Sequence, residues 1–317
     1  MAITQQPNTD RIPLKGHKPL SRITLHNWPA ILFGLPFFIA GLPILSIGMG
    51  WMDYSKASIH APLWVIGVVG GLFVACGIWL MFHGATGLRR MWNMSHGKKE
   101  LPNRPWLWDY PWQASGITDK KLQGSLSSVV ALAVFVTFLA PFNWIAFVSD
   151  SGGIFWQVLT GLFDVVILVG VGIYLLKKVG QFLTFGTGQV SFQEFPFFLG
   201  QTMSLTIERL PIDISTVQFH LRCIEEAYEI RKRGRKRESI VVCYQIYHDT
   251  QTIRGELINE TGQLRCSWNL PDDKHLTSTP SERPATFWKL EVRGERPGLD
   301  YHSLFLLPVY TKIEADS

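Results

Sequence analysis

Residues 30–52 read AILFGLPFFIAGLPILSIGMGWM and contain no charged side chain. A helix of about 20 apolar residues matches the roughly 30 Å hydrocarbon thickness of a bilayer. Three further runs are nearly as apolar: PLWVIGVVGGLFVACGIWLMFH at 62–83, LSSVVALAVFVTFLAPFNWIAFV at 126–148 and IFWQVLTGLFDVVILVGVGIYLL at 154–176. The sequence therefore predicts four transmembrane helices. Because the links after the first and third runs are short, we expect two helical hairpins.

The composition divides the chain into an apolar part and a more polar part. Of the 317 residues, 47% are hydrophobic and 17% are charged, whereas soluble domains carry about 25% charge. The missing charge is concentrated in the four apolar runs, and residues 200–317 resemble an ordinary soluble sequence. We therefore predict the following regions: an N-terminal arm at 1–28, a transmembrane domain at 29–178 that includes a cytoplasmic loop at 84–125, and a soluble domain at 188–317.

Loop charge predicts the orientation of the helices. The arm, the central loop and the segment after the fourth run are rich in Lys and Arg. In the two short links, the only Lys or Arg is Lys56. Positively charged loops remain in the cytoplasm. We therefore expect both termini, the central loop and the soluble domain to be cytoplasmic.

Asp164 lies near the centre of the fourth run. A carboxyl group at that depth is costly, and by default it indicates a functional site. Three interpretations are open: a neutral acid bonded to a serine or threonine, a proton- or ion-linked role, and a contact with another membrane subunit. Glycines in the first two runs favour close helix packing, within the bundle or between subunits.

The central loop contains the aromatic segment RPWLWDYPW at 104–112. Its prolines exclude a buried span, and amphipathic rings favour the headgroup region of a membrane. We interpret the aromatic side chains as interfacial anchors or as a cap below the helices, with a ligand-stacking platform as the alternative. They are Trp106, Trp108, Tyr110 and Trp112.

From about residue 188 the pattern changes to alternation of apolar and polar residues. Within TFWKLEVRGE, 286–295, Trp288, Leu290 and Val292 share one face. Similar strands are expected at 203–210, 217–230, 238–249 and 303–310. Strands at regular spacing predict an all-β sandwich. A hairpin that turns at Gly234 would place Cys223 near Cys243. We interpret the four cysteines as free thiols, since their spacing fits neither a metal site nor a disulfide framework.

The predicted hairpin tip is the run RKRGRKR at 231–237. It is interpreted as a solvated turn that blocks edge pairing, as a contact with anionic lipid, or as a contact with an acidic protein. No aromatic residues interleave the charges, so a nucleic-acid partner is not expected. The charged residues are Arg231, Lys232, Arg233, Arg235, Lys236 and Arg237.

Three stretches resemble a family of bacterial inner-membrane proteins of unknown function with transmembrane helices and a cytoplasmic arrestin-like β-sandwich. They are RPWLWDYPWQASGI at 104–117, FPFFLGQTMSLTIER at 195–209 and FWKLEVRGERPGLDYHSLFLLPVY at 287–310. Asp109 departs from the family pattern, in which a basic residue is expected. The resemblance implies the bacterial inner membrane, the arrestin-like fold and a scaffold-like role. It implies no reaction and no catalytic residues.

A search for catalytic chemistry finds no metalloprotease, nucleophile-elbow or phosphate-loop motif. Haem between helices requires two facing histidines, and only His26 and His83 lie near one predicted interface. We expect no cofactor and no enzymatic activity.

The leading hypothesis is a non-enzymatic membrane scaffold or adaptor. It would act as a homo-oligomer or with other membrane subunits, and would recruit a cytoplasmic protein by strand-edge pairing or through the basic tip. The alternative is an oligomeric channel or ion-linked transporter that uses Asp164. A membrane-bound enzyme is a third hypothesis. The scaffold hypothesis also predicts that a fragment of residues 190–317 folds alone.

Overall fold

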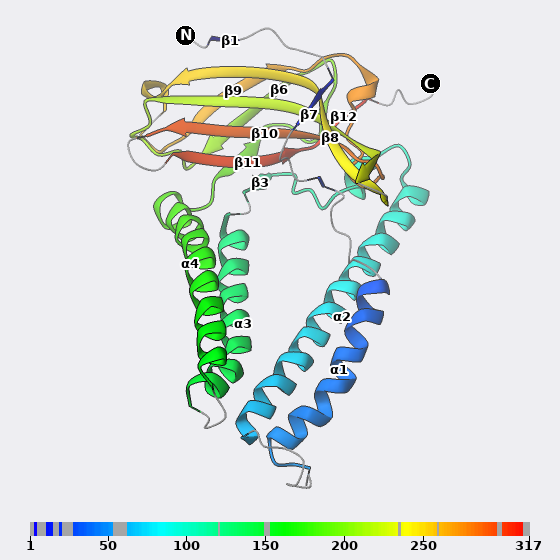
Figure 1. Ribbon diagram of the computed structural model, residues 1–317. Coiled ribbons are helices and arrows are strands. Elements are labelled where there is room, and N and C mark those ends of the chain that lie inside the picture. Colours follow the sequence, from blue (N-terminus) through cyan, green and yellow to red (C-terminus); the bar gives the residue numbers. More distant parts are fainter. Residues whose placement is uncertain are drawn as a thin grey trace. The chain divides into compact units, whose positions relative to one another are not determined.

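The structure is a computed structural model of the 317-residue chain (Figure 1). It describes residues 3–4, 11–14, 19–20, 28–52, 62–119, 121–148, 153–233, 236–258, 260–296 and 300–312. The chain divides into two compact units. The β unit comprises residues 1–24, 93–122 and 181–317, and the helical unit comprises residues 25–92 and 123–180.

Four long helices occupy the predicted apolar runs, and by length and composition each is able to cross a membrane. Their large apolar side chains are widely exposed, as at Ile154 (80%) and Leu183 (75%). An apolar surface of this extent is expected where lipid rather than water surrounds the helices. The helices are α1 (Trp28–Gly48), α2 (Leu63–Glu100), α3 (Lys121–Phe147) and α4 (Ile154–Phe185).

α2, α3 and α4 are longer than the apolar runs that predicted them, whereas α1 ends at Gly48, before the end of its run at residue 52. α2 continues to Glu100, and α4 continues past Lys177 to Phe185. Helix continues wherever the backbone meets no breaker, and residues 84–100 include no proline. Part of the central loop predicted at 84–125 is therefore helix, and only residues 101–120 connect α2 to α3.

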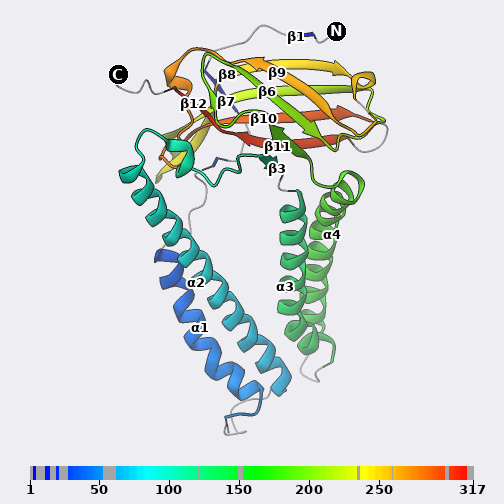
Figure 2. The same cartoon turned by 180° about the vertical axis from the view of Figure 1, so that it is seen from behind.

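Close contact between α1 and α2 depends on glycines, as the sequence predicted. A Cβ atom added to Gly77 would lie 2.6 Å from the Phe38 main-chain nitrogen, which is closer than non-bonded atoms approach. Small residues of this kind let two helix backbones approach each other. Figures 1 and 2 show α1 beside α2 and α3 beside α4, in agreement with two hairpins. The other close-contact glycines are Gly34, Gly41, Gly48 and Gly70.

The larger sheet of the β unit is antiparallel and has the strand order β1-β8-β7-β10-β11, with β2 also paired to β8. Its long strands coincide with the alternating stretches. The strands are β1 (Ile3–Thr4), β2 (Ile12–Pro13), β7 (Thr216–Arg233), β8 (Lys236–Arg254), β10 (Thr286–Glu295) and β11 (Tyr301–Leu307).

The second sheet is also antiparallel and has the order β3-β4-β6-β9. A short parallel pair, β5 (Phe197–Phe198) with β12 (Val309–Tyr310), completes the strands. β3 comes from the central segment between α2 and α3, so this segment contributes to the sandwich. The strands of the second sheet are β3 (Gly116–Thr118), β4 (Gln189–Phe192), β6 (Thr202–Glu208) and β9 (Leu264–Asn269).

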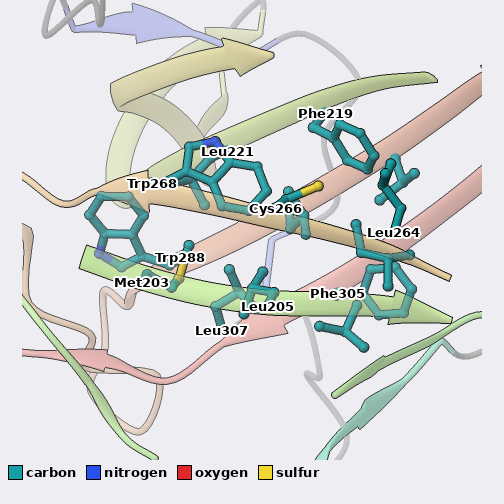
Figure 3. Packing of buried hydrophobic residues seen from close by; sticks show 14 of the residues in the cluster. Met203, Leu205, Phe219, Leu221, Leu264, Cys266, Trp268, Trp288, Phe305 and Leu307 are labelled. Carbon is teal, nitrogen blue, oxygen red and sulfur yellow. The ribbon is translucent and has the colours of Figure 1, made fainter. Parts of the chain in front are cut away.

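One hydrophobic core joins the two sheets (Figure 3). Trp288, Leu290 and Val292 all face it, which confirms the face predicted from the alternation in β10. Met203 and Leu205 of β6 and Trp268 of β9 contribute from the second sheet. Completely buried aromatic and aliphatic side chains each contribute roughly 1.5–3 kcal/mol by leaving water. The core therefore accounts for a stable antiparallel β domain.

The predicted proximity of Cys223 and Cys243 is wrong. Cys223 pairs with Tyr247, and Cys243 pairs with Glu226. The hairpin is centred between residues 234 and 235 rather than on Gly234, and a bulge at Cys223–Ile224 shifts the register further. A bulge inserts one extra residue into one strand, and its position could not be predicted from alternation. All four cysteines are free thiols.

Candidate functional site

The aromatic segment of the central loop packs against the sandwich. The Trp106 ring lies edge-on to Phe198, with ring centroids 5.6 Å apart, and 6.0 Å from the ring centroid of Tyr310. The Trp112 indole donates a hydrogen bond to the Tyr310 hydroxyl at 2.9 Å. These contacts join the central loop to strands β5 and β12. The predicted contact of this segment with lipid stays a prediction.

Asp109 is the buried polar centre of this packing, with 2% of its surface exposed. One carboxylate oxygen accepts a hydrogen bond from the Ser281 amide at 2.8 Å, and the other accepts one from the Tyr310 hydroxyl at 3.4 Å. Burial raises the pKa of Asp109, and the hydrogen bonds from Ser281 partly oppose that rise. An acid at this position therefore holds the loop between α2 and α3 against the loop that precedes β10.

The remaining aromatic residues of the segment pack locally. The Trp108 indole donates to the Leu101 carbonyl at 3.0 Å, and its side chain occupies the space that a Cβ at Gly97 would need. The Tyr110 and Trp112 rings lie 4.5 Å apart. All four predicted aromatic residues are partly buried.

A buried ion pair lies where the central segment enters α3. The Lys121 ammonium lies 3.1 Å from an Asp119 carboxylate oxygen and donates to the Ser303 hydroxyl at 2.7 Å. Ser303 in turn donates to Asp119 at 2.9 Å. Burial lowers the pKa of Lys121, and the charge of Asp119 opposes that shift. Because each group has a polar partner, we interpret this cluster as a structural contact between the start of α3 and strand β11.

The predicted basic tip lies on the β7–β8 hairpin, as expected. The ladder continues to Arg233 paired with Lys236, and Lys232 pairs with Arg237. Arg237 is exposed. Arg235 lies outside the described residues, and the structure describes only the backbone of Arg231, Lys232, Arg233 and Lys236. Lipid or partner contact by this tip stays a prediction.

Asp164 of α4 is half-buried and lies beside α3. The Asn143 side-chain amide donates to an Asp164 carboxylate oxygen at 3.3 Å, and also to the Leu139 carbonyl at 3.3 Å. One of the three interpretations of Asp164 gave it a serine or threonine partner, and the observed partner is an asparagine. This contact connects the two helices of the second hairpin.

The outer face of the larger sheet, opposite the core, carries an ionic network around Glu291. Its carboxylate contacts Arg222 at 2.7 Å, Arg293 at 2.7 Å and His302 at 2.8 Å. Burial alone would raise the pKa of Glu291, but hydrogen bonds from His302 and Arg293 and the charge of Arg222 outweigh it. They hold that pKa well below its usual range.

Two histidines extend this network towards β8. His220 and His248 have stacked rings 5.6 Å apart, and the Thr250 hydroxyl lies 3.1 Å and 2.9 Å from their nearest ring nitrogens. Burial, followed by the charge of Arg222, lowers the pKa of His220 to about 4 and also lowers that of His248. A hollow of about 360 Å³ lies nearby, with both basic Arg293 and acidic Asp300 in its wall. The mixed charge favours no single class of ligand.

The described part of the chain was compared with the ligand pattern of a metal site and with the two histidines near the predicted interface. Among those residues, no group of three or more His, Cys, Asp or Glu side chains is placed to hold a metal ion. His83 packs edge-on against Trp79, with ring centroids 4.7 Å apart, and His26 lies outside the described residues.

Sequence reasoning missed three features. The ionic network brings together charges from β7, β10 and β11, and only the register shows that they meet. Asn143 was visible within the third apolar run as an amide, a residue type that hydrogen-bonds across membrane helices. The strands of the N-terminal arm had no detectable pattern, because two residues are too few for alternation.

No family model matches the sequence, and no curated protein matches it either. Among solved structures, part of the chain is similar to the crystal structure of Spo0M, a sporulation control protein from Bacillus subtilis. The identity is 12%, the similarity covers 39% of this chain and 49% of that chain, and the TM-score is 0.22. The chain thus matches about half the length of that protein. The strand pairing and the core of this chain define its sandwich independently of that similarity.

Proposed function

We propose that this protein is a non-enzymatic scaffold of the bacterial inner membrane. In this proposal the four helices span the bilayer and hold the β unit at the cytoplasmic face, where it recruits a cytoplasmic protein. In this proposal the β unit is an arrestin-like adaptor, and the adaptor role is an analogy, because a fold does not determine a function.

The observation that carries the proposal is the interleaving of the two units along the chain. The β unit is built from three separate stretches, 1–24, 93–122 and 181–317. The stretches between them are the two helical hairpins, and each hairpin would cross a bilayer twice. Three stretches that fold together must lie on one side of the membrane, so this arrangement supports an even number of crossings and termini on the same side.

The interleaving also supports a scaffold. The chain passes between the units at residues 24/25, 92/93, 122/123 and 180/181. Four connections tether a domain more closely to the membrane than a single flexible linker would. A domain tethered in this way suits recruitment to a membrane. The excess of Lys and Arg in the β-unit stretches near the helices supports the cytoplasmic side.

The basic tip of the β7–β8 hairpin supports an accessory contact with anionic lipid. A basic residue near such a surface contributes about 1 kcal/mol. In the proposal this contact orients the platform, and partner recruitment is a property of the sandwich itself.

Photo-crosslinking in intact cells tests the scaffold proposal. A photoreactive amino acid replaces Arg265, an exposed residue of the terminal strand β9, or Arg237 at the hairpin. Val158, an exposed residue of α4, is the control position. We expect a discrete protein adduct at a sandwich position that is missing at Val158. If only lipid-sized adducts form at every sandwich position tested, the scaffold proposal is wrong.

The alternative, an oligomeric channel or ion-linked transporter, rests on Asp164 and its contact with Asn143 between α3 and α4. Polar side chains within the membrane mark ion pathways in many proteins, and they also join helices. Proteoliposome flux measurements separate these roles. The channel predicts a flux that Asp164→Asn abolishes, whereas the scaffold predicts that neither protein conducts.

A further inference from the structure

The edge of the larger sheet is occupied by the protein's own N-terminal arm. β2 pairs antiparallel with β8, with Ile12 opposite Gln245 and Pro13 opposite Tyr244. The Leu14 amide then donates to the Cys243 carbonyl at 2.9 Å. β1 continues the same edge, with Ile3 opposite Thr252. An exposed edge strand is a template for pairing with another chain, and here the arm takes that position.

Side chains make this pairing specific. The Arg11 guanidinium lies 3.1 Å from a Glu225 carboxylate oxygen and 4.3 Å from the centroid of the Tyr244 ring. Pro13 is tolerated because an edge strand can lack one amide donor. The arm therefore presents a basic residue followed by an apolar-proline-apolar sequence, in extended form.

Two leucines of the arm cover a small apolar cluster on the outer face. The cluster consists of Ile224, Cys243, Ala285 and Phe287, each less than 5% exposed. Leu14 and Leu20 pack against it, together with Leu306. This cluster is separate from the main core between the sheets. Without the arm, it would form an exposed apolar patch beside an unpaired strand edge.

In β-augmentation, an extended peptide adds a strand to an unpaired sheet edge, and a neighbouring apolar patch can receive its side chains. In such sites, main-chain hydrogen bonds provide affinity and alternate side chains provide specificity. Among its described residues, the arm makes both kinds of contact, and its strands β1 and β2 are each two residues long. Short pairings of this kind open at a low free-energy cost compared with the long strands of a core.

We propose that the β8 edge and the outer apolar cluster form a peptide-binding surface, and that the N-terminal arm is its built-in, displaceable occupant. The partner is an extended segment of a cytoplasmic protein with the chemistry of the arm, namely a basic residue followed by apolar, proline and apolar residues. This inference rests on the proposed scaffold function and assigns its recruitment surface. The arm thereby keeps the surface closed until a partner segment replaces it.

Cys243 reports on this surface because it lies within the covered cluster and is 3% exposed. Burial raises the pKa of its thiol to about 11, and the reactive species in thiol labelling is the thiolate. Cys223 and Cys266 lie in the main core and serve as internal controls. Cys76→Ser removes the exposed thiol.

The test uses the whole purified protein in nanodiscs, with maleimide labelling read by mass spectrometry. We expect labelling of Cys243 to accelerate by about tenfold or more when residues 1–20 are removed, or when Leu14→Asp is introduced in the full chain. The reason is the loss of local protection. A synthetic peptide with the sequence of residues 9–20 should restore slow labelling in the shortened chain. The same peptide with aspartate in place of Ile12 and Leu14 should not.

Four results would overturn the inference. The first is unchanged Cys243 labelling in both variants, and the second is a peptide that gives no protection. The third is faster labelling of Cys223 together with Cys243, since the arm would then be an integral part of the sandwich. The fourth is conversion of a dimer to a monomer when the arm is removed, since the occupant would then be the arm of a second copy.

This experiment needs no cellular partner, so its outcome is independent of the crosslinking test. Peptide protection without a crosslinked protein would refute the scaffold and leave the binding surface intact. A crosslinked partner without peptide protection would place recruitment elsewhere on the β unit.

Discussion

The carboxylate of Asp109 accepts hydrogen bonds from the Ser281 amide and the Tyr310 hydroxyl in a buried position. Asp109→Ala would leave both donors unsatisfied, at a cost of about 1–3 kcal/mol. We expect a clearly lower melting temperature for this variant, measured by tryptophan fluorescence of the whole protein in detergent. Asp109→Asn keeps an acceptor oxygen and should lose less. Asp272→Ala is the control because Asp272 is exposed, and equal stability of the two alanine variants would refute the role of Asp109.

From the position of His220 we predict how the free energy of unfolding depends on pH. Burial lowers its pKa to about 4, the charges of Arg222, His248 and Arg293 act in the same direction, and the charge of Glu291 opposes them. Between pH 6.5 and 4 the unfolded chain binds a proton at this position that the folded chain does not, so stability falls as the pH falls. Glu291, whose pKa is also lowered, loses its stabilising charge at still lower pH.

We therefore expect the melting temperature to decrease from pH 7 to pH 5, and His220→Gln to flatten that decrease. His275→Gln, at an exposed position in the loop before β10, is the matched control. A profile that His220→Gln leaves unchanged would show that the histidine pair does not determine acid sensitivity.

At the scale of elements, α1 and α2 offer a matched pair of glycines. A methyl group at Gly77 would meet the Phe38 nitrogen at 2.6 Å, whereas at Gly71 the nearest atom is the Leu45 side chain at 3.9 Å. We expect Gly77→Ala to separate the helices and lower the melting temperature in micelles. Gly71→Ala should have little effect. Equal effects of the two substitutions would mean that close α1–α2 contact is not required.

The sequence predicted those elements whose pattern is long. Apolar runs such as 30–52 located the helices, and alternation in 286–295 located β10 and its core face, because each pattern repeats over many residues. β3 is three residues long and pairs with β4, which follows α4 in the chain. Nothing local in Gly116–Thr118 indicates that distant partner.

The same limit applies to the candidate site. The basic tip was predictable because its charges are consecutive in the sequence. Asp109 stood out only as a departure from a resemblance, and its role depends on Ser281 and Tyr310, which are remote in the chain. The covering of Cys243 by Leu14 depends in the same way on remote pairing.

At the scale of the whole molecule, the interleaved β unit revises the expectation that residues 190–317 fold alone. That fragment lacks β3 and the Asp109 segment. A single chain in which residues 93–122 are joined to 181–317 by a short Gly/Ser linker restores both. The linker can be short because the ends to be joined lie close together. The Asp119 amide donates to the Gly188 carbonyl, and the Lys121 ammonium lies over the Phe185 ring.

We expect the joined chain to give a dispersed NMR spectrum and cooperative unfolding, and the fragment of residues 190–317 to give neither. A well-folded fragment would show that the central segment is dispensable. A joined chain that stays unfolded would show that the β unit needs the helices.

We propose that the sandwich lies at the cytoplasmic face of a membrane that the four helices cross. Single cysteines at Lys274 in the β unit and at Gly153, just before α4, test it most directly in cells that carry the Cys76→Ser background. With a membrane-impermeant maleimide, we predict labelling of Gly153→Cys in intact cells, and labelling of Lys274→Cys only after the membrane is opened. Labelling of Lys274→Cys in intact cells would show that the sandwich lies outside the cytoplasm.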